Sequence, residues 1–104
     1  MIDLNGVTIE AVNFGAQGIE EIYQNLRTLY TTPVGTVPFD REFGINSDVL
    51  DSSLPIAQGR LTVEYIEKTR KYERRATVKE VEFISNTENG VLIPKVVIEI
   101  VDNA

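Results

Sequence analysis

The sequence contains no cysteine and no histidine, and both absences narrow its chemistry. Without cysteine the chain has no disulfide and no thiol nucleophile. Without histidine it lacks the commonest general base, and with it the Ser-His and Cys-His pairs that activate nucleophiles. Cysteine and histidine are also the usual zinc ligands, whereas carboxylates alone favour harder ions. We therefore expect no catalytic site, no metal and no cofactor.

Positive charge and long apolar runs are also scarce. The chain has 10 Lys and Arg residues against 16 Asp and Glu residues, for a formal net charge of −6. This balance disfavours nucleic acid and anionic membrane as partners, because phosphate binding needs clustered positive charge. No apolar run reaches the length that spans a membrane, and the start, MIDLNGVTIEAV, lacks a signal-peptide pattern. We expect no membrane partner and no secretory leader.

The remaining composition is that of an ordinary globular protein. The 104 residues are 42% hydrophobic and 25% charged, which allows one modest core. No internal repeat or low-complexity segment divides the chain. We predict a single domain that spans residues 1–104.

The spacing of the apolar residues predicts five elements. They are a strand over 7–12, a helix from 19 to 30 or 31, a helix from 54 to about 70–72, and strands over 76–85 and 91–101. Pro33 ends the first helix, and Ser53 is the expected N-cap of the second. This β-α-α-β-β order predicts an α+β domain in which two helices pack on a small antiparallel sheet.

Further details concern the strands and the second helix. A change of phase along residues 76–85 predicts a β-bulge near Lys79-Glu80, and Asn89-Gly90 predicts the hairpin connection. Pro94 has no amide hydrogen, which favours an edge position or a bulge. The stripe expected to bury the second helix consists of Leu54, Ala57, Leu61, Tyr65 and Tyr72, broadened by Val63 and Ile66.

The segment between the helices, YTTPVGTVPFDREFGI (30–45), is too apolar for a linker and too broken for a helix. Its two prolines fix φ, and its two glycines permit turns that other residues resist. Phe39 and Phe43 are expected to anchor this loop on the core. Two interpretations stay open: a packed connection between helices, or a rigid loop that presents the charged residues 40–42 to a partner protein.

With its preceding helix, the segment LRTLYTTPVGTVPFDREFGI resembles the small baseplate wedge proteins of contractile phage tails. This family includes a baseplate subunit of type VI secretion systems, and some of its members carry a lysozyme label. Its pattern is a leucine-rich helix end, then T-P-x-G, a short spacer and [PR]-[DE]-[FY]-G. The positions that match the pattern here are Thr32, Pro33, Gly35, Arg41, Glu42, Phe43 and Gly44.

A second signature of the family is a Glu-Pro-Arg triplet after the second helix. Glu73 and Arg75 match its outer positions, while Arg74 replaces the proline, a departure from the pattern that leaves the local backbone geometry open. The resemblance covers roughly residues 16–101. Taken alone, Glu73 and Arg75 fit a solvated charged face, whereas the resemblance implies a buried or interfacial polar network.

The geometry of that network has two possible forms. Positions two apart in an extended segment point to the same side, so Glu73 and Arg75 can pair with each other. Alternatively, each can bind a group on the loop. We predict the second form, with Glu73 on Arg41 or Arg75 on Glu42, because it would join the two motifs into one surface.

The resemblance implies a structural assembly role. The protein would bind other baseplate wedge subunits and the tail sheath protein, and would start sheath polymerisation around the tail tube. An exposed hairpin strand supplies a mechanism, because its free backbone groups can accept a strand from another chain. The protein would occupy the bacterial cytoplasm during assembly and the virion baseplate afterwards. In isolation we expect a monomer or a weak homo-oligomer.

Two other functions stay open. The family's fold is shared by a stress anti-adaptor that binds a proteolysis factor, so a regulatory binding protein is the alternative. A lysozyme-like glycoside hydrolase is less favoured, because Arg74 and Arg75 favour the ionised form of Glu73, the wrong direction for a general acid. A surrounding run of tail genes would favour assembly, and an isolated stress-induced gene would favour the adaptor.

Overall fold

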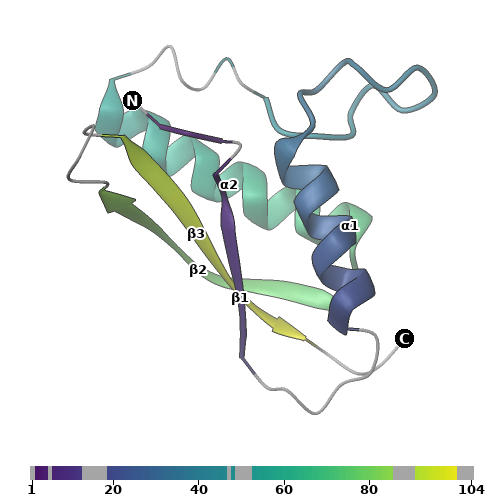
Figure 1. The fold of residues 1–104 in the computed structure, drawn as a ribbon. Coiled ribbons are helices and arrows are strands. Elements are labelled where there is room, and N and C mark those ends of the chain that lie inside the picture. Colours follow the sequence, from purple (N-terminus) through teal and green to yellow (C-terminus); the bar gives the residue numbers. More distant parts are fainter. Residues whose placement is uncertain are drawn as a thin grey trace.

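In the computed structural model, a three-stranded sheet is covered on one face by two helices (Figure 1). The structure describes residues 2–4, 6–12, 19–46, 48, 53–85 and 91–100. The elements in chain order are β1 (Thr8–Val12), α1 (Ile19–Thr31), α2 (Leu54–Tyr72), β2 (Ala76–Ser85) and β3 (Leu92–Ile100). The predicted α+β class and the β-α-α-β-β order are confirmed.

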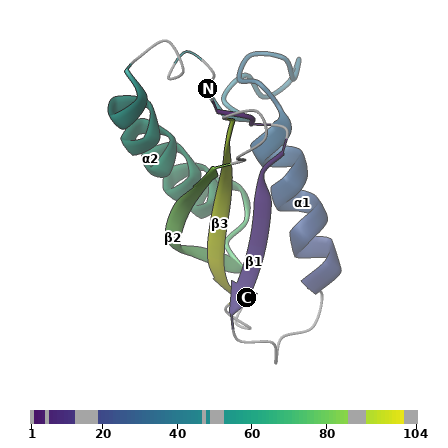
Figure 2. The same ribbon diagram turned by 60° about the vertical axis from the view of Figure 1, so that its left-hand side comes forward.

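The strand order is β1-β3-β2, so the last strand of the chain is the central one (Figure 2). β2 and β3 pair antiparallel, and a register shift between Val78 and Glu80 confirms the predicted bulge. β1 instead runs parallel to β3, with Thr8 opposite Lys95. The sheet is therefore mixed rather than wholly antiparallel. Parallel neighbours require a long crossover connection, which the two helices and β2 supply.

Pro94 lies in the central strand, so the prediction of an edge position or a bulge for it is wrong. It lies opposite Phe83 of β2, and the ladder with β1 begins one residue later, at Lys95. Two residues before Pro94, Leu92 forms an isolated bridge with Ile2. On the side of β3 that faces β1, Pro94 therefore lies between the bridge at Leu92 and the ladder that begins at Lys95. Its missing amide hydrogen removes no hydrogen bond of that ladder.

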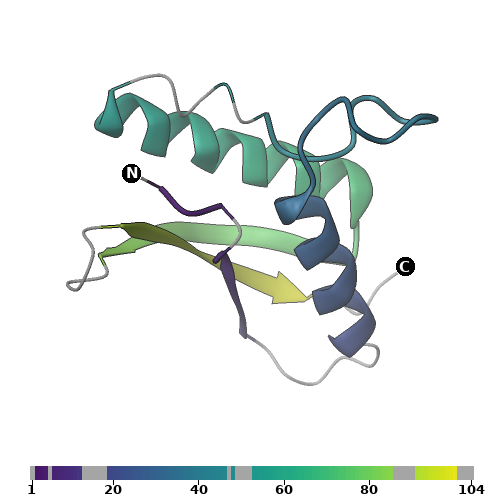
Figure 3. The same ribbon diagram turned by 45° about the horizontal axis from the view of Figure 1, so that its top comes forward.

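One face of the sheet and one face of each helix form a single core (Figure 3). Its main buried side chains are Ala11 of β1, Ile22, Leu26, Leu29 and Tyr30 of α1, Ala57, Leu61 and Tyr65 of α2, Ala76 of β2, and Val96, Ile98 and Ile100 of β3. The spacing of three or four residues in the helices and two in β3 follows from their geometries. The opposite face carries charged side chains, among them the ion pair of Lys95 Nζ with Glu10 Oε2 at 2.7 Å.

The buried stripe of α2 is narrower than predicted. Leu54 and Val63 are 44% and 51% exposed, whereas Thr69 is fully buried. Ser53 precedes the helix, but its side chain makes no capping hydrogen bond, and its carbonyl instead accepts the amide of Ala57 at 2.8 Å. The predicted turn at Asn89-Gly90 lies outside the described residues. Within the described ranges, no helix combines the length and the apolar character needed to cross a membrane.

Candidate functional site

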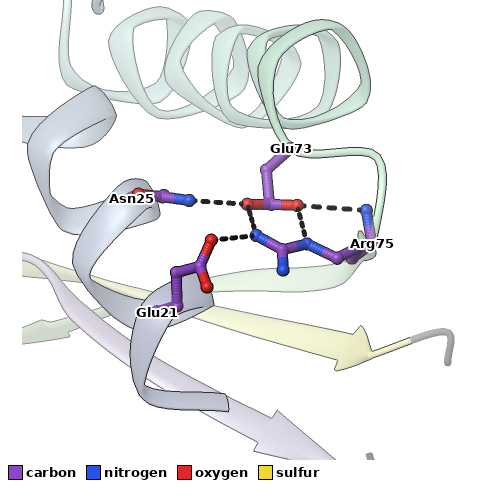
Figure 4. A network of polar contacts seen from close by, with 4 residues as sticks. All are labelled: Glu21, Asn25, Glu73 and Arg75. Carbon is purple, nitrogen blue, oxygen red and sulfur yellow. Dashed lines mark hydrogen bonds and ion pairs between the residues drawn. The ribbon is translucent and has the colours of Figure 1, made fainter. Parts of the chain in front are cut away.

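The turn between α2 and β2 places Glu73 and Arg75 side by side (Figure 4). Glu73 is the C-cap residue directly after α2, and its amide donates to the carbonyl of Thr69 at 2.9 Å. Its own carbonyl accepts the amide of Ala76, the first residue of β2, at 3.2 Å. These two bonds define a short turn, and from its end the Arg75 side chain folds back over Glu73.

The carboxylate of Glu73 accepts hydrogen bonds on both oxygens. Arg75 donates Nε to Oε1 at 2.9 Å and Nη2 to Oε2 at 3.0 Å, and its backbone amide donates to Oε1 at 3.2 Å. Asn25 of α1 donates Nδ2 to Oε2 at 3.1 Å. The Glu73 side chain is only 6% exposed. Bidentate, charge-assisted pairs of this kind are among the strongest hydrogen bonds in proteins.

This cluster, which we call the Glu73 knot, joins three elements. Asn25 belongs to α1, and so does Glu21, whose Oε1 accepts Nη2 of Arg75 at 3.3 Å. Glu73 caps the end of α2, and Arg75 directly precedes β2. Hydrogen bonds from Arg75, and secondarily from Asn25, hold the pKa of Glu73 below its ordinary value, although burial opposes them. The same bond raises the pKa of Arg75. The knot is therefore ionised at neutral pH.

The predicted pairing of the knot with the loop is wrong. Glu73 and Arg75 bind each other rather than Arg41 and Glu42. Their heads point toward α1, and the two-residue spacing lets the guanidinium close on the carboxylate without any group from the loop (Figure 4). The carboxylate of Glu42 is held instead by Lys71 of α2.

The loop between the helices is closed at its base by backbone hydrogen bonds. The amide of Ile45 donates to the carbonyl of Thr32 at 2.8 Å, and the amide of Val34 donates to the carbonyl of Ile45 at 3.2 Å. Pro33 forms a bridge with Ile45 at the same point. Gly44 is buried there with φ +112°, and a Cβ would overlap the carbonyl oxygen of Thr32. The base of the loop therefore requires glycine at position 44.

Side chains of α2 hold the second half of the loop. The Phe43 ring packs edge-on against Tyr72, with ring centroids 5.0 Å apart, so Phe43 is the anchor that was predicted. The Tyr72 hydroxyl donates to Oδ1 of Asp40 at 2.9 Å. Glu42 pairs with Lys71 in an exposed position, and this bond lowers the pKa of Glu42 and raises that of Lys71.

The tip of the loop extends beyond the end of α1 (Figure 1). Gly35, with φ +91°, turns the chain there, and its amide donates to the carbonyl of Arg41 at 3.0 Å. Arg41 is exposed. Phe39 is fully exposed, so its predicted role as a core anchor is wrong. The neighbouring Pro38 is exposed as well, and the tip thus presents an aromatic ring to solvent.

β2 offers a second exposed feature beside the knot. It is the longest strand, with ten residues, and it lies at one edge of the sheet (Figure 2). Among the described residues, its only paired neighbour is β3. Within the described ranges, the outer row of backbone groups of β2 therefore pairs with no other strand and can accept one from another chain.

The features described above differ in what they present to solvent. In the parts of the chain that the structure describes, no group of three or more acidic side chains is arranged to hold a metal ion. The Glu73 carboxylate is enclosed by donors from its own chain. Phe39 at the tip and the β2 edge face outward.

Two comparisons with known proteins gave no match. No protein-family model matches it. No curated protein matches it at a significant level.

Sequence reasoning missed Asn25 and Glu21 as partners of the knot. Both lie on the polar face of α1, where one sequence carries no sign of which polar residue meets a distant helix end. It also gave Phe39 the wrong role. The flanking Pro38 and charged residues 40–42 are the local signal that favours a turn tip over a buried anchor.

Proposed function

We propose that this protein is a structural subunit of the baseplate of a contractile phage tail or a related injection system. It binds other wedge subunits and the sheath protein, and it starts sheath polymerisation. The observation that carries the proposal is the free edge of the ten-residue strand β2. An extended segment of another chain adds to such an edge through main-chain hydrogen bonds.

The rigidity of the surroundings supports an assembly role. The Glu73 knot fixes the start of β2 against both helices. The loop is closed at its base and tied to α2 through Phe43 and Asp40. A surface that is ordered before binding loses less conformational entropy when a partner docks. The resemblance to the wedge family supplies the identity of the partners.

Phe39 gives the loop an aromatic contact. Its ring is fully exposed at the tip of a loop whose base is fixed. Buried aromatic side chains carry much of the binding energy of protein interfaces. We expect Phe39 to enter an apolar pocket on a neighbouring wedge subunit, so that Phe39→Ala weakens assembly without lowering the thermal midpoint.

A lysozyme-like activity is disfavoured by the state of Glu73. A glycosidase general acid needs a raised pKa, whereas hydrogen bonds from Arg75 lower the pKa of this carboxyl. We expect no clearing of a peptidoglycan suspension in a turbidity assay. Clearing by the wild type that a single acidic substitution abolishes would contradict the proposal.

The proposal is tested by placing proline on the β2 edge. Neighbouring amides of a strand point to opposite edges, so Glu82→Pro and Ser85→Pro lie on opposite sides. One of the two should lower the thermal midpoint by breaking a bond to β3. The other variant, whose proline lies on the outer edge, should leave the thermal midpoint nearly unchanged. It is the informative variant, because it blocks the edge without disturbing the fold.

Each variant is co-expressed with the proteins encoded beside it, and the particles are measured by size-exclusion chromatography and negative-stain electron microscopy. The wild type should join a larger particle, and the stable proline variant should stay behind as a small species. Assembly that survives every proline substitution that leaves the fold intact would overturn strand addition.

A further inference from the structure

A pocket of about 250 Å³ lies where α2 ends and β2 begins. Its lining residues are Ile66, Arg70, Arg74, Ala76, Thr77 and Val78. Three of them are consecutive residues of β2, yet successive side chains of a strand point to opposite faces. A pocket that touches all three therefore lies across the edge of β2 rather than on one face of the sheet.

Two arginines give this pocket positive charge. Arg70 lies in the last turn of α2 and Arg74 in the turn that follows it, and both are exposed. Among the residues that the structure describes, neither guanidinium has an ionic or hydrogen-bonding partner. In contrast, Arg75 is fully engaged in the knot. In a chain of net charge −6, two guanidinium groups without a partner in the described ranges suit an anion at this pocket.

The rest of the lining narrows the kind of anion. Ala76 is buried, Ile66 and Val78 are half-buried, and together they form an apolar floor. Thr77 adds a hydroxyl at the rim. Guanidinium forks bind carboxylate and phosphate alike, but an apolar floor suits the aliphatic stem of an acidic side chain better than a phosphate surrounded by oxygens.

We propose that the pocket binds the carboxylate of an acidic side chain in an extended partner segment that pairs with the edge of β2. The inference deepens the proposed function and rests on it for the incoming strand. It assigns Arg70 and Arg74 the role of setting the register. A slip of one residue moves every side chain of an added strand to the other face, so one acidic residue held at a fixed point selects a single pairing.

The direct test uses the whole chain and two blocked hexapeptides, TVTEVT and TVTQVT, which differ only in the charge of one side chain. Binding is followed by nuclear magnetic resonance, through the backbone amides of β2 and the Nε–H signals of Arg70 and Arg74. We expect the glutamate peptide to bind about ten-fold more tightly than the glutamine peptide, because charge-assisted bonds to two guanidinium groups are lost in the latter.

Substitutions in the chain locate the effect. Arg70→Gln and Arg74→Gln should each remove most of the preference for glutamate. Arg60→Gln is the matched control, since it removes the same charge from α2, the helix that carries Arg70, outside this pocket. It should keep the preference. A thermal melt of each variant confirms that the fold is intact.

Three results would overturn the inference. They are equal binding of the two peptides, a preference that survives both pocket substitutions, and inorganic phosphate that shifts the two arginine signals as strongly as the glutamate peptide. The experiment is independent of the proline test. Failure here with assembly still blocked by an edge proline would reject the carboxylate site and leave strand addition standing.

Discussion

Glu73 and Glu42 each pair with a cation, one beyond the end of α2 and one on the loop, but their surroundings differ. The Glu73 side chain is 6% exposed and binds Asn25 of α1 and Arg75 of the turn before β2. The Glu42 side chain is 73% exposed, and its partner Lys71 is 51% exposed. Solvent and salt screen the second pair far more than the first. The knot therefore fixes structure, whereas the pair of Glu42 with Lys71 contributes little to stability.

The loop keeps its shape through its backbone and aromatic contacts rather than through its charges. Gly44 closes its base and Phe43 packs against Tyr72. We expect these positions to be sensitive to substitution and the charged positions to be tolerant.

The largest predicted loss is for Gly44→Ala. The new Cβ would overlap the carbonyl of Thr32 in a backbone conformation that alanine disfavours, so unfolding should become easier by about 3 kcal/mol or more. Gly35→Ala is the matched control. Gly35 also has a positive φ, but no atom lies where its Cβ would be placed. This substitution should lower the free energy of unfolding by about 1 kcal/mol. Urea denaturation followed by circular dichroism measures both, and equal losses would reject steric closure of the loop base.

The next loss is for Glu73→Gln. The amide keeps the volume but cannot accept all the donors of the buried carboxylate, so about 2 kcal/mol of unfolding free energy should be lost. Glu42→Gln removes the same charge from an exposed position and should leave chemical denaturation nearly unchanged. Similar losses for the two variants would remove the distinction between the knot and the loop.

The pH dependence of stability should report the ionisation of Glu73. The knot lowers the pKa of Glu73 below its usual 4.5, so its contribution is fully present above pH 4.5 and is lost as the pH falls through the lower, folded value. The wild type should therefore lose its advantage over Glu73→Gln as the solution is acidified below pH 4.5. This advantage at neutral pH should persist in high salt. A constant difference between the two proteins at all acidic pH values would contradict the prediction.

The smallest predicted effects concern two tyrosines in the core, whose polar groups offer a comparison with the knot. The rings of Tyr30 and Tyr65 pack edge-on, with their centroids 4.8 Å apart. The Tyr30 hydroxyl forms a hydrogen bond with the Thr69 hydroxyl, whereas the Tyr65 hydroxyl has no partner among the described residues. Burial raises the pKa of Tyr30 to about 12 and raises that of Tyr65 as well.

Tyr30→Phe should cost about 1 kcal/mol, because it leaves the Thr69 hydroxyl unpaired. Tyr65→Phe should be neutral or stabilising by up to about 1 kcal/mol, because it removes a buried unpaired group. Thermal unfolding of the two variants, side by side, checks the sign of each change. A larger loss for Tyr65→Phe than for Tyr30→Phe would show that the hydroxyl of Tyr65 is paired.

The elements and much of the core could be predicted from the sequence because apolar spacing is a local signal. The bulge followed from a change of phase along β2, and Tyr65 lies fully buried as predicted. The direction of β1 could not be predicted, since a strand's own pattern does not specify which way its neighbour runs. The exposure of Phe39 and the contact of Asn25 with Glu73 depend on how distant segments meet, and one sequence does not encode that in its spacing.

Hydrogen exchange on the assembled particle tests the central claim, that the edge of β2 receives a strand. Peptides that cover residues 76–85 are compared by mass spectrometry between the free protein and the particle formed with its partners. We predict slower exchange in this segment on assembly, and little change in β1, the other edge of the sheet. Unchanged exchange over 76–85 in a fully formed particle would contradict strand addition at β2.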